Sequence, residues 1–499
     1  MKLFSAVLLL SLLSLSNAKE EPLKAGVRGS VTTKEFDSSV SYNFKDGLTH
    51  TLSGSEVDGE LCDPSSKSVS GYMDITGSKY DDKGADKHFF YWFFEKRIKS
   101  LGPDFESPDS AEYDKKTPFI VWLTGGPGCS SSLALLTENG PCSVNKDGAT
   151  TKQNPNSWTE AANVLWLDQP AGVGFSYGKE NDSNEEMIGE DAYFFLQAFF
   201  KANPKYQENP VYIVGESYGG HYAPAIAHKI FLENKNLQKD MIRLNLSGLA
   251  VGNGLTKPEE QYKWYADMAF KNSHGIKVVG EETYKMMKAG AGPCGELAHA
   301  CNSGATFIEK MACQTAFIEC NMAETAPYRL TGLNPYDIRK KCEVQPLCYD
   351  FSHIQKWMNS DATRKALHVT NKSGEWASCN MGINGKFHVD WMKDFSGYVA
   401  DMLNAGIPAL IYAGDVDFIC NYLGNKAWTS KLDWDHGKCF RSAEDHVWGK
   451  GKDGKGAGMA KTANGFTFLQ VFDAGHMVPA DQPEVALSMI QNFITGGTF

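Results

Sequence analysis

Residues 215–219 read GESYG and hold Ser217 between two glycines, an arrangement that can present a serine as a nucleophile. Because so short a pattern recurs by chance, its flanking sequence decides what it means. The apolar run VYIV precedes it and HYAPAIAHKI follows it, which predicts a strand, a sharp turn and a helix. This is the arrangement of a nucleophile elbow, which exposes the serine hydroxyl at the carboxyl end of a strand. Open α/β sheets bind their ligands at that edge.

A serine hydroxyl becomes a good nucleophile only when a histidine removes its proton and a carboxylate orients that histidine. On a nucleophile elbow these groups follow in the order serine, Asp or Glu, and histidine. The run YAGDVDF carries Asp415 and Asp417 at the end of an apolar segment, and FDAGHMVP ends the next such segment with His476. Sequence order alone does not choose between the two aspartates. The remaining histidines near these motifs are expected to be packed or on the surface: His88, His221 and His228.

Acyl transfer also requires hydrogen-bond donors for the oxyanion that forms at the attacked carbonyl. The turn Gly125-Gly126-Pro127-Gly128 closes an apolar run upstream of the elbow, where α/β-hydrolases supply one backbone N–H. The residue after the nucleophile, Tyr218, supplies the other. A purely structural turn is the alternative for the glycines alone. The presence of all these motifs in the expected order favours the catalytic interpretation.

The elements that must position these residues are apolar strands alternating with helices. Such a pattern predicts an α/β fold with a mixed, mostly parallel sheet covered by helices on both faces. We expect strands within 118–126, 163–172, 209–217, 244–254, 408–420 and 467–479, and helices within 187–204, after residue 220 and within 483–494.

The pattern changes between residues 258 and 390, which are rich in Lys, Ala and Met and hold a cluster of cysteines. We interpret this part as an insertion, because strands of the core type resume after it. The predicted organisation is therefore a signal peptide at 1–18, an N-terminal arm or short pro-segment at 19–60, a core in two parts at 61–257 and 391–499, and the inserted lid at 258–390.

The first residues predict a secreted protein. Lys2 precedes an apolar stretch that ends at the small residue Ala18, the pattern of a secretory signal peptide. The twelve cysteines are therefore expected to form disulfides. A zinc site is disfavoured because the cysteine cluster within 258–390 holds no CxxC pair. Sequons at Asn181, Asn245 and Asn371 are candidate N-glycosylation sites.

The net charge of −11 disfavours nucleic acid and anionic membranes as partners. No internal stretch approaches the run of about 18 apolar residues that spans a bilayer. Neither a metal nor an organic cofactor is expected.

Taken together, the motifs resemble the serine carboxypeptidases, in particular the carboxypeptidase Y type. The strings that carry this resemblance are WLTGGPGCSS, LDQPAGVGFSY, GESYGGHYAP, GNGLT, YAGDVDFICN and GHMVP. The resemblance runs from about Gly71 to the C-terminus. It implies an α/β-hydrolase fold with an inserted, disulfide-stapled helical lid.

The resemblance also implies a role for individual residues. Ser217 is the expected nucleophile and His476 the base, and Asp417 is preferred to Asp415 because it directly precedes the FIC string. Gly126 and Tyr218 become the oxyanion-hole donors. The substrate's free C-terminal carboxylate is expected to bind Trp122, Thr124, Glu138 and Glu216.

Thr124 departs from the family pattern, which usually has asparagine at that position. A threonine hydroxyl can donate one hydrogen bond, but its reach is shorter and it lacks the amide's donor and acceptor pair. Glu138 and Glu216 predict an acidic pH preference, because two adjacent carboxyl groups share a proton and only a protonated one donates to a carboxylate.

The family positions that bind the side chain before the scissile bond are apolar and aromatic here, which predicts a preference for large hydrophobic side chains. Besides Tyr218, these positions are Leu255, Tyr262, Tyr265, Trp391, Ile419, Cys420 and Met477. Cys420 matches a cysteine that is unpaired in the carboxypeptidase Y type. The disulfides that the resemblance implies are Cys129–Cys379, Cys294–Cys320, Cys301–Cys313 and Cys342–Cys348. A Cys62–Cys142 disulfide is a further prediction with less support, and Cys439 has no assigned partner.

The function predicted is a serine carboxypeptidase that releases single C-terminal residues from peptides and proteins through an acyl-enzyme. An esterase or acyltransferase on the same scaffold is the alternative that Thr124 keeps open, and a non-catalytic protective or binding protein is a third. The expected location is the secretory pathway, with a lysosome or vacuole or the extracellular space as the destination. A homodimer is one option for the assembly.

Overall fold

The computed structural model describes residues 38–43, 49–76, 79–80, 86–97, 115–304, 306–451 and 454–499. All of them belong to one compact unit, Glu35–Phe499. The predicted signal peptide at 1–18 lies outside the described residues, as does much of the segment 19–60.

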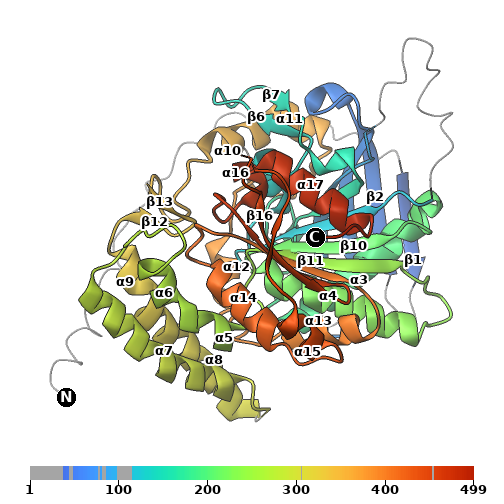
Figure 1. The fold of residues 1–499 in the computed structure, drawn as a ribbon. Coiled ribbons are helices and arrows are strands. Elements are labelled where there is room, and N and C mark those ends of the chain that lie inside the picture. Colours follow the sequence, from blue (N-terminus) through green and yellow to red (C-terminus); the bar gives the residue numbers. More distant parts are fainter. Residues whose placement is uncertain are drawn as a thin grey trace. The chain divides into compact units, whose positions relative to one another are not determined.

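A sheet of 13 strands forms the centre of this unit (Figure 1). Its middle strands, in the order β8-β5-β10-β11-β14-β17, run parallel, and antiparallel strands extend it on both sides. The expected mixed α/β sheet is therefore present. The strands of the sheet are β1 (Ser38–Asn43), β2 (Thr49–Val57), β3 (Ser68–Ile75), β4 (Lys87–Phe94), β5 (Phe119–Thr124), β8 (Asn163–Leu167), β9 (Tyr177–Gly178), β10 (Val211–Glu216), β11 (Leu246–Gly252), β14 (Ala409–Gly414), β15 (His446–Trp448), β16 (Gly458–Ala463) and β17 (Phe466–Val471).

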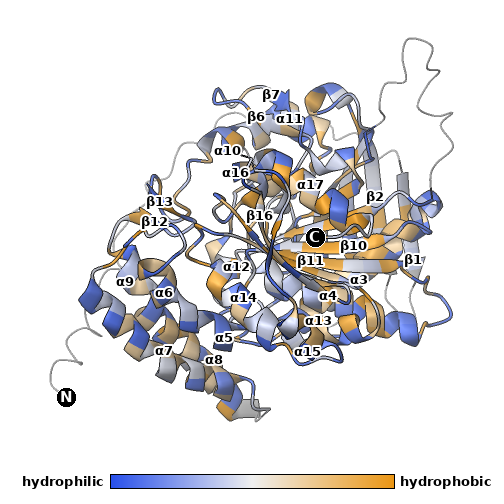
Figure 2. Cartoon of the chain, viewed as in Figure 1, coloured by the Kyte–Doolittle hydropathy of each residue, from blue (hydrophilic) through white to orange (hydrophobic). Residues whose placement is uncertain are grey.

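Helices cover both faces of the sheet, because alternate residues of its apolar strands point into two different cores. In β5, for example, Phe119 and Val121 belong to one core and Ile120 and Trp122 to the other. Figure 2 shows the resulting concentration of hydrophobic residues in β10 and β11. The first core is closed by α3 (Glu185–Ala202), α4 (Gly219–Lys235), α13 (Ser396–Asn404) and α14 (Tyr422–Lys431), and the second by α2 (Ser131–Thr137), α10 (Ser352–Met358) and α17 (Pro483–Ile494).

Most of the remaining helices follow β11 and precede β14, two strands that pair directly with each other in the sheet. The insertion predicted at 258–390 thus enters and leaves the core between adjacent strands. It contains α5 (Pro258–Gln261), α6 (Tyr265–Phe270), α7 (Glu281–Cys301), α8 (Thr306–Cys320), α9 (Ala326–Arg329), the hairpin of β12 (Leu333–Asn334) and β13 (Asp337–Lys341), α10, α11 (Asp361–Ala366) and α12 (Met381–Lys386). Outside it lie the hairpin of β6 (Cys142–Val144) and β7 (Thr151–Gln153), and the short helices α15 (Gly437–Ser442) and α16 (Val478–Asp481).

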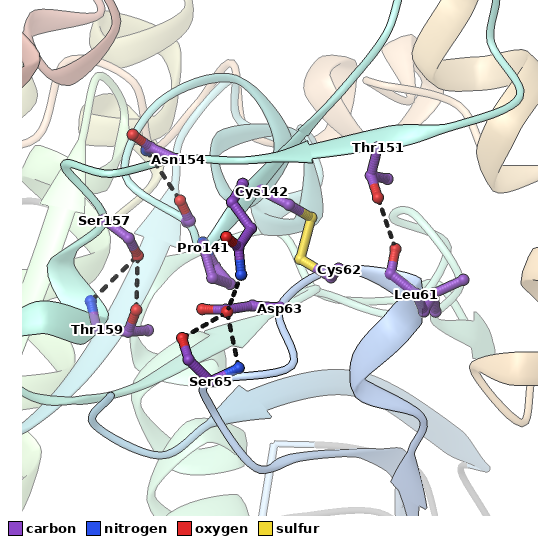
Figure 3. The surroundings of a disulfide bond; sticks show 12 residues. Leu61, Cys62, Asp63, Ser65, Pro141, Cys142, Thr151, Asn154, Ser157 and Thr159 are labelled. Atoms are coloured by element: carbon purple, nitrogen blue, oxygen red, sulfur yellow. Dashed lines mark hydrogen bonds between the residues drawn. A yellow bond between two sulfur atoms is a disulfide. The ribbon is translucent and has the colours of Figure 1, made fainter. Parts of the chain in front are cut away.

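The described part of segment 19–60 belongs to the sheet rather than to a loose arm, since β1 pairs with β2 and β2 with β3. The chain after β2 is tied to the β6–β7 hairpin by the Cys62–Cys142 disulfide. Figure 3 shows Asp63 beside this bond, where its carboxylate accepts from the hydroxyl and the amide of Ser65. The guanidinium of Arg97 also donates to it, at 2.7 Å.

Two disulfides, Cys294–Cys320 and Cys301–Cys313, join α7 to α8. A third, Cys342–Cys348, closes a short loop after β13, and Cys129–Cys379 joins the turn after β5 to the end of the insertion. The structure therefore contains the nested pairing that the family resemblance implies. Among the described residues, two cysteines are free, Cys420, which is buried, and Cys439, which is exposed.

The Cys129–Cys379 bond is expected to contribute strongly to stability, because it closes a loop of 250 residues and is flanked by hydrogen bonds from Ser130 N to Ser378 O and from Asn380 N to Gly128 O. We predict that the double variant C129S/C379S loses about 2–5 kcal/mol of unfolding free energy. Urea unfolding of the wild-type and variant proteins measures this. The matched control is C439S, which removes a free, exposed thiol and is expected to unfold at the wild-type urea concentration.

Candidate active site

Ser217 sits at the turn between β10 and α4, with a backbone φ of 63°. Few non-glycine residues adopt this conformation, and it is the one that a nucleophile elbow imposes. Glycine is required two residues before the serine because a Cβ on Gly215 would lie 2.4 Å from the Gly219 carbonyl oxygen. The Ser217 amide donates to Gly252 O of the neighbouring strand at 3.1 Å. These contacts hold the serine at the carboxyl edge of the sheet.

His476 and Asp417 meet at the same edge, in the loops that follow β17 and β14. The imidazole Nδ1 lies 2.8 Å from Asp417 Oδ2. Asp417 is fully buried, and its carboxylate also accepts from the amides of Ile419 and Cys420. A carboxylate held in this way fixes the imidazole with Nε2 available as a base.

Asn253 is a residue of the site that sequence reasoning did not assign, although the GNG string that contains it was noted. Its side-chain amide donates to Asp417 Oδ2 at 2.8 Å, and its Oδ1 accepts from Gly414 N. Its φ of 41° is one that asparagine tolerates better than most residues. Asn253 thus joins the end of β11 to the aspartate loop.

The insertion supports both loops from outside the sheet. Pro335 O accepts from the amides of Phe418 and Ile419, and Tyr336 O accepts from the amide of His476 at 2.8 Å. The Tyr336 ring also lies 5.0 Å from the imidazole, centroid to centroid. These are contacts between residues far apart in sequence, and no motif in the sequence signals them.

Ser217 and His476 are brought to one edge of the sheet, but no hydrogen bond joins these two described side chains. The structure connects them through Asp417 instead. His476 binds the aspartate directly, and the serine backbone binds β11, whose next residue, Asn253, holds the same aspartate.

The other candidate acid and histidines have different partners. Asp415 pairs with His274 at 3.0 Å and accepts from Asp473 N, so Asp417 is the aspartate that meets His476.

His221 is buried with its ring nitrogens facing backbone carbonyls, and burial lowers its pKa to about 4. His228 faces Asp401, and His88 faces Asp74 and Asp86.

The two expected oxyanion donors lie on segments in direct contact. A Cβ on Gly125 would lie 2.2 Å from the amide nitrogen of Tyr218, so only glycine allows the turn after β5 to approach the elbow this closely. Gly126 has a φ of 108°, a conformation that glycine adopts without strain. Two backbone N–H groups, from Gly126 and Tyr218, are thereby available on either side of this contact.

Glu138 and Glu216 form a buried carboxyl pair beside these groups. Glu216 ends β10, opposite Thr124 of β5 in the strand register, and Glu138 caps the end of α2. Their carboxyl groups interact by a hydrogen bond, and burial together with the neighbouring acid raises the pKa of Glu216 well above its usual range. Burial also raises the pKa of Glu138, against the charge of His476. The pair therefore retains a proton at a pH where exposed glutamates are ionised.

Trp122 and Thr124 contact each other. The fully buried indole N–H of Trp122 donates to Thr124 Oγ1 at 2.9 Å, and the Thr124 amide donates to Ser131 Oγ. The threonine hydroxyl accepts from the indole, so its own proton is available for another acceptor.

The expected pocket residues form a contiguous aromatic wall. The Trp391 indole donates to Tyr262 OH at 3.1 Å, the Tyr262 ring lies 4.9 Å from Tyr265, and Tyr218 lies 5.4 Å from Trp391. Tyr265 OH donates to Ile419 O. Leu255 and Cys420 are buried, whereas Ile419 and Met477 are partly exposed. The wall carries no acidic side chain among these residues.

The serine carboxypeptidase family model matches residues 59–496 of the chain. Carboxypeptidase Y of Candida albicans is 40% identical over 486 residues, which cover 96% of this chain and 82% of the relative. Carboxypeptidase Y of Komagataella phaffii is 42% identical over 434 residues, or 86% and 76% of the two chains. Among solved structures, a prohormone-processing carboxypeptidase of Saccharomyces cerevisiae, Kex1(delta)p, superposes with a TM-score of 0.75 at 26% identity, covering 88% of this chain and 95% of that one.

The role of Asn253 can be tested by N253G, which removes the donor to Asp417 and keeps a residue that accepts positive φ. We predict that the reaction of Ser217 with a fluorophosphonate slows by roughly ten- to hundredfold, since a small displacement of a catalytic group has effects of that size. The control is N464G, the same substitution at another positive-φ asparagine, in the turn between β16 and β17. Equal labelling rates for N253G and wild type would rule out a positioning role.

Proposed function

Because the chain belongs to the serine carboxypeptidase family, we propose that Ser217, Asp417 and His476 are the triad with which it removes single residues from peptide C-termini. The observation that carries this proposal is the hydrogen bond between His476 and the buried Asp417, formed at the sheet edge that also presents the Ser217 elbow. The buried pair of Glu138 and Glu216 next to it is proposed to bind the free C-terminal carboxylate of the substrate, which restricts the reaction to that end of the peptide.

In the proposed reaction, Ser217 Oγ attacks the last peptide carbonyl of the substrate while His476 Nε2 takes its proton. The backbone N–H groups of Gly126 and Tyr218 donate to the resulting oxyanion. The imidazolium, stabilised by Asp417, then gives the proton to the leaving amine, and the C-terminal amino acid departs. Water, deprotonated by His476, attacks the ester, and Ser217 recovers its proton as the shortened peptide leaves.

Recognition of the substrate carboxylate is assigned to Thr124, Glu138 and Glu216, with Trp122 behind the threonine. One oxygen of each glutamate, Oε2, is buried without a hydrogen-bond partner in the described structure. Buried polar atoms are nearly always hydrogen-bonded, so a proton shared between the two carboxyl groups or a bound substrate must satisfy these oxygens. A protonated glutamate donates one hydrogen bond to the carboxylate and the Thr124 hydroxyl donates another, while the Trp122 indole N–H keeps that hydroxyl in position.

The wall formed by Tyr218, Tyr262, Tyr265 and Trp391 is the proposed pocket for the side chain before the scissile bond. Its lack of an acidic group favours large apolar side chains over Lys or Arg, since a buried cation would have no partner there.

We also assign the protein to the secretory pathway, with a lysosome or vacuole or the extracellular space as its destination. Its disulfides suit an oxidising compartment. Two of its sequon asparagines, Asn245 and Asn371, are exposed and Asn181 is partly exposed, as glycan attachment requires. No helix among the described residues is long and apolar enough to cross a membrane.

The proposed activity can be tested on peptides offered as free acids and as C-terminal amides. Single residues are expected to leave the acids, and the amides to react at least about tenfold more slowly, because their uncharged ends lose a charge-assisted hydrogen bond. The variant S217A should lose both activities by more than about 10⁴-fold. The control, S303A, changes an exposed serine of the insertion and should match wild type. Equal rates on acids and amides would favour the esterase or acyltransferase alternative instead, and undiminished activity of S217A would refute the proposed nucleophile.

The carboxyl pair predicts how peptide binding depends on pH. Because the raised pKa keeps one carboxyl protonated in acid, the donor to the substrate carboxylate is lost as pH rises through that pKa. KM for free-acid peptides should then increase by roughly tenfold per pH unit above it. In E138Q/E216Q, whose amides donate at every pH, KM should stay constant over the same range.

KM is measured by steady-state kinetics from acid to neutral pH. The control variant is E282Q, which changes a glutamate whose side chain is 90% exposed and should keep the wild-type pH dependence. A wild-type KM that stays constant across this range would contradict the shared-proton hypothesis.

A further inference from the structure

Behind the proposed pocket lies a second buried acidic pair, Glu185 and Asp390, that the triad and the carboxylate site do not use. Glu185 begins α3 and is 3% exposed, and Asp390 directly precedes Trp391 and is 7% exposed. Within the described part of the chain, neither carboxyl forms an ion pair with a lysine or an arginine. Burial raises the pKa of both carboxyl groups, and the charge of Asp390 raises that of Glu185 further.

Acids buried without a cation are costly, and such groups are concentrated at functional sites. Here the cluster reaches the site through Tyr218, whose phenol donates to Asp390 Oδ2 at 3.2 Å. The same tyrosine follows the nucleophile, so its backbone N–H faces the oxyanion position while its hydroxyl is held on the far side. Its ring packs 5.4 Å from Trp391 and stacks on the buried His221 at 4.4 Å.

Asp390 is therefore connected to two adjacent parts of the pocket wall, to Trp391 through the chain and to Tyr218 through a hydrogen bond. Without the hydrogen bond to Asp390, only contacts with neighbouring rings would hold the Tyr218 ring. Such packing restricts the orientation of a ring less than a directed hydrogen bond does. The backbone at the elbow is also held independently of this contact, since the Ser217 amide donates to Gly252 O and the Ser217 carbonyl accepts from the amides of Gly220 and Leu255. Loss of the phenol contact should therefore affect the pocket more than the nucleophile.

We propose that Asp390 is a positioning residue that sets specificity for the side chain before the scissile bond, by holding the Tyr218 hydroxyl so that its ring closes the pocket. Glu185 keeps this carboxyl in a cation-free, buried environment at the start of α3. The inference rests on the proposed carboxypeptidase function, because the pocket acts only on a bound peptide.

The test compares kcat/KM on two free-acid peptides that differ only in Phe or Ala before the scissile bond. The wild-type protein should prefer Phe, and D390A should lower the Phe-to-Ala ratio by about tenfold, the range expected for a disturbed apolar pocket. Y218F should lower it to the same extent, and D390A/Y218F should have no larger effect, because both variants remove one hydrogen bond. D390N retains an acceptor oxygen and should keep the ratio within about threefold of wild type.

A merely structural role would reduce the amount of active protein, which lowers kcat for both peptides and leaves their ratio unchanged. The control E186Q changes the exposed glutamate next to Glu185 and should leave the ratio at its wild-type value. If D390A proves too unstable to purify, Y218F and D390N decide the question, since Y218F must lower the ratio and D390N must keep it.

An unchanged ratio in Y218F, or effects of D390A and Y218F that multiply in the double variant, would overturn the assignment. If the wild-type protein releases no residue from either peptide, the proposed function fails rather than the role of Asp390. A wild-type protein that cleaves both peptides without preferring Phe refutes the pocket and the role of Asp390 together.

Discussion

The active site depends on one constraint, which is that strands β10, β14 and β17 must all end at the same edge of the sheet. Parallel pairing from β5 through β17 makes this possible, since every strand of the run has its carboxyl end on that side. Ser217, Asp417 and His476 each follow one of these strands. Between β10 and β14 lies β11, and its next residue, Asn253, bridges the gap by bonding to the aspartate.

The same edge concentrates buried acids, and their environments divide them by role. Asp417 accepts from two backbone amides and from the side-chain amide of Asn253, and it faces the imidazole of His476. Glu138 and Glu216 face each other instead, and burial raises the pKa of both carboxyl groups. The carboxylate proposed to orient the base and the carboxyl groups proposed to donate to the substrate therefore lie in different surroundings, since Asp417 is surrounded by hydrogen-bond donors and burial raises the pKa of both glutamates.

The insertion is part of this arrangement rather than an addition to its surface. Pro335 and Tyr336 accept hydrogen bonds from the loops that carry Asp417 and His476, while Tyr262 and Tyr265 of the same insertion line the proposed pocket. Most buried residues of α7 and α8 belong to the first core of the molecule, and two disulfides join these helices. A change in the insertion is therefore expected to act on both catalysis and specificity.

The sequence alone determined the order of the strands along the chain, the elbow at Ser217, and the positions of the aspartate and histidine after later strands. Local patterns are sufficient for these features, since glycine spacing and apolar runs report on backbone geometry within a few residues. Residues 38–43 and 49–57 carry no strong apolar period, so their place in the sheet was not predicted. That place is decided by pairing with β3.

Order along the chain leaves Asp415 and Asp417 equivalent, and only the family resemblance preferred Asp417; the tertiary structure shows that Asp417 meets His476 whereas Asp415 meets His274. The tertiary structure also decided the contacts of Asn253, Tyr336 and Asp390, which join them to Asp417, His476 and Tyr218, residues 140 to 172 positions away. Such contacts leave no periodic signal in a single sequence, since they depend on how separate elements pack and not on the residues beside them.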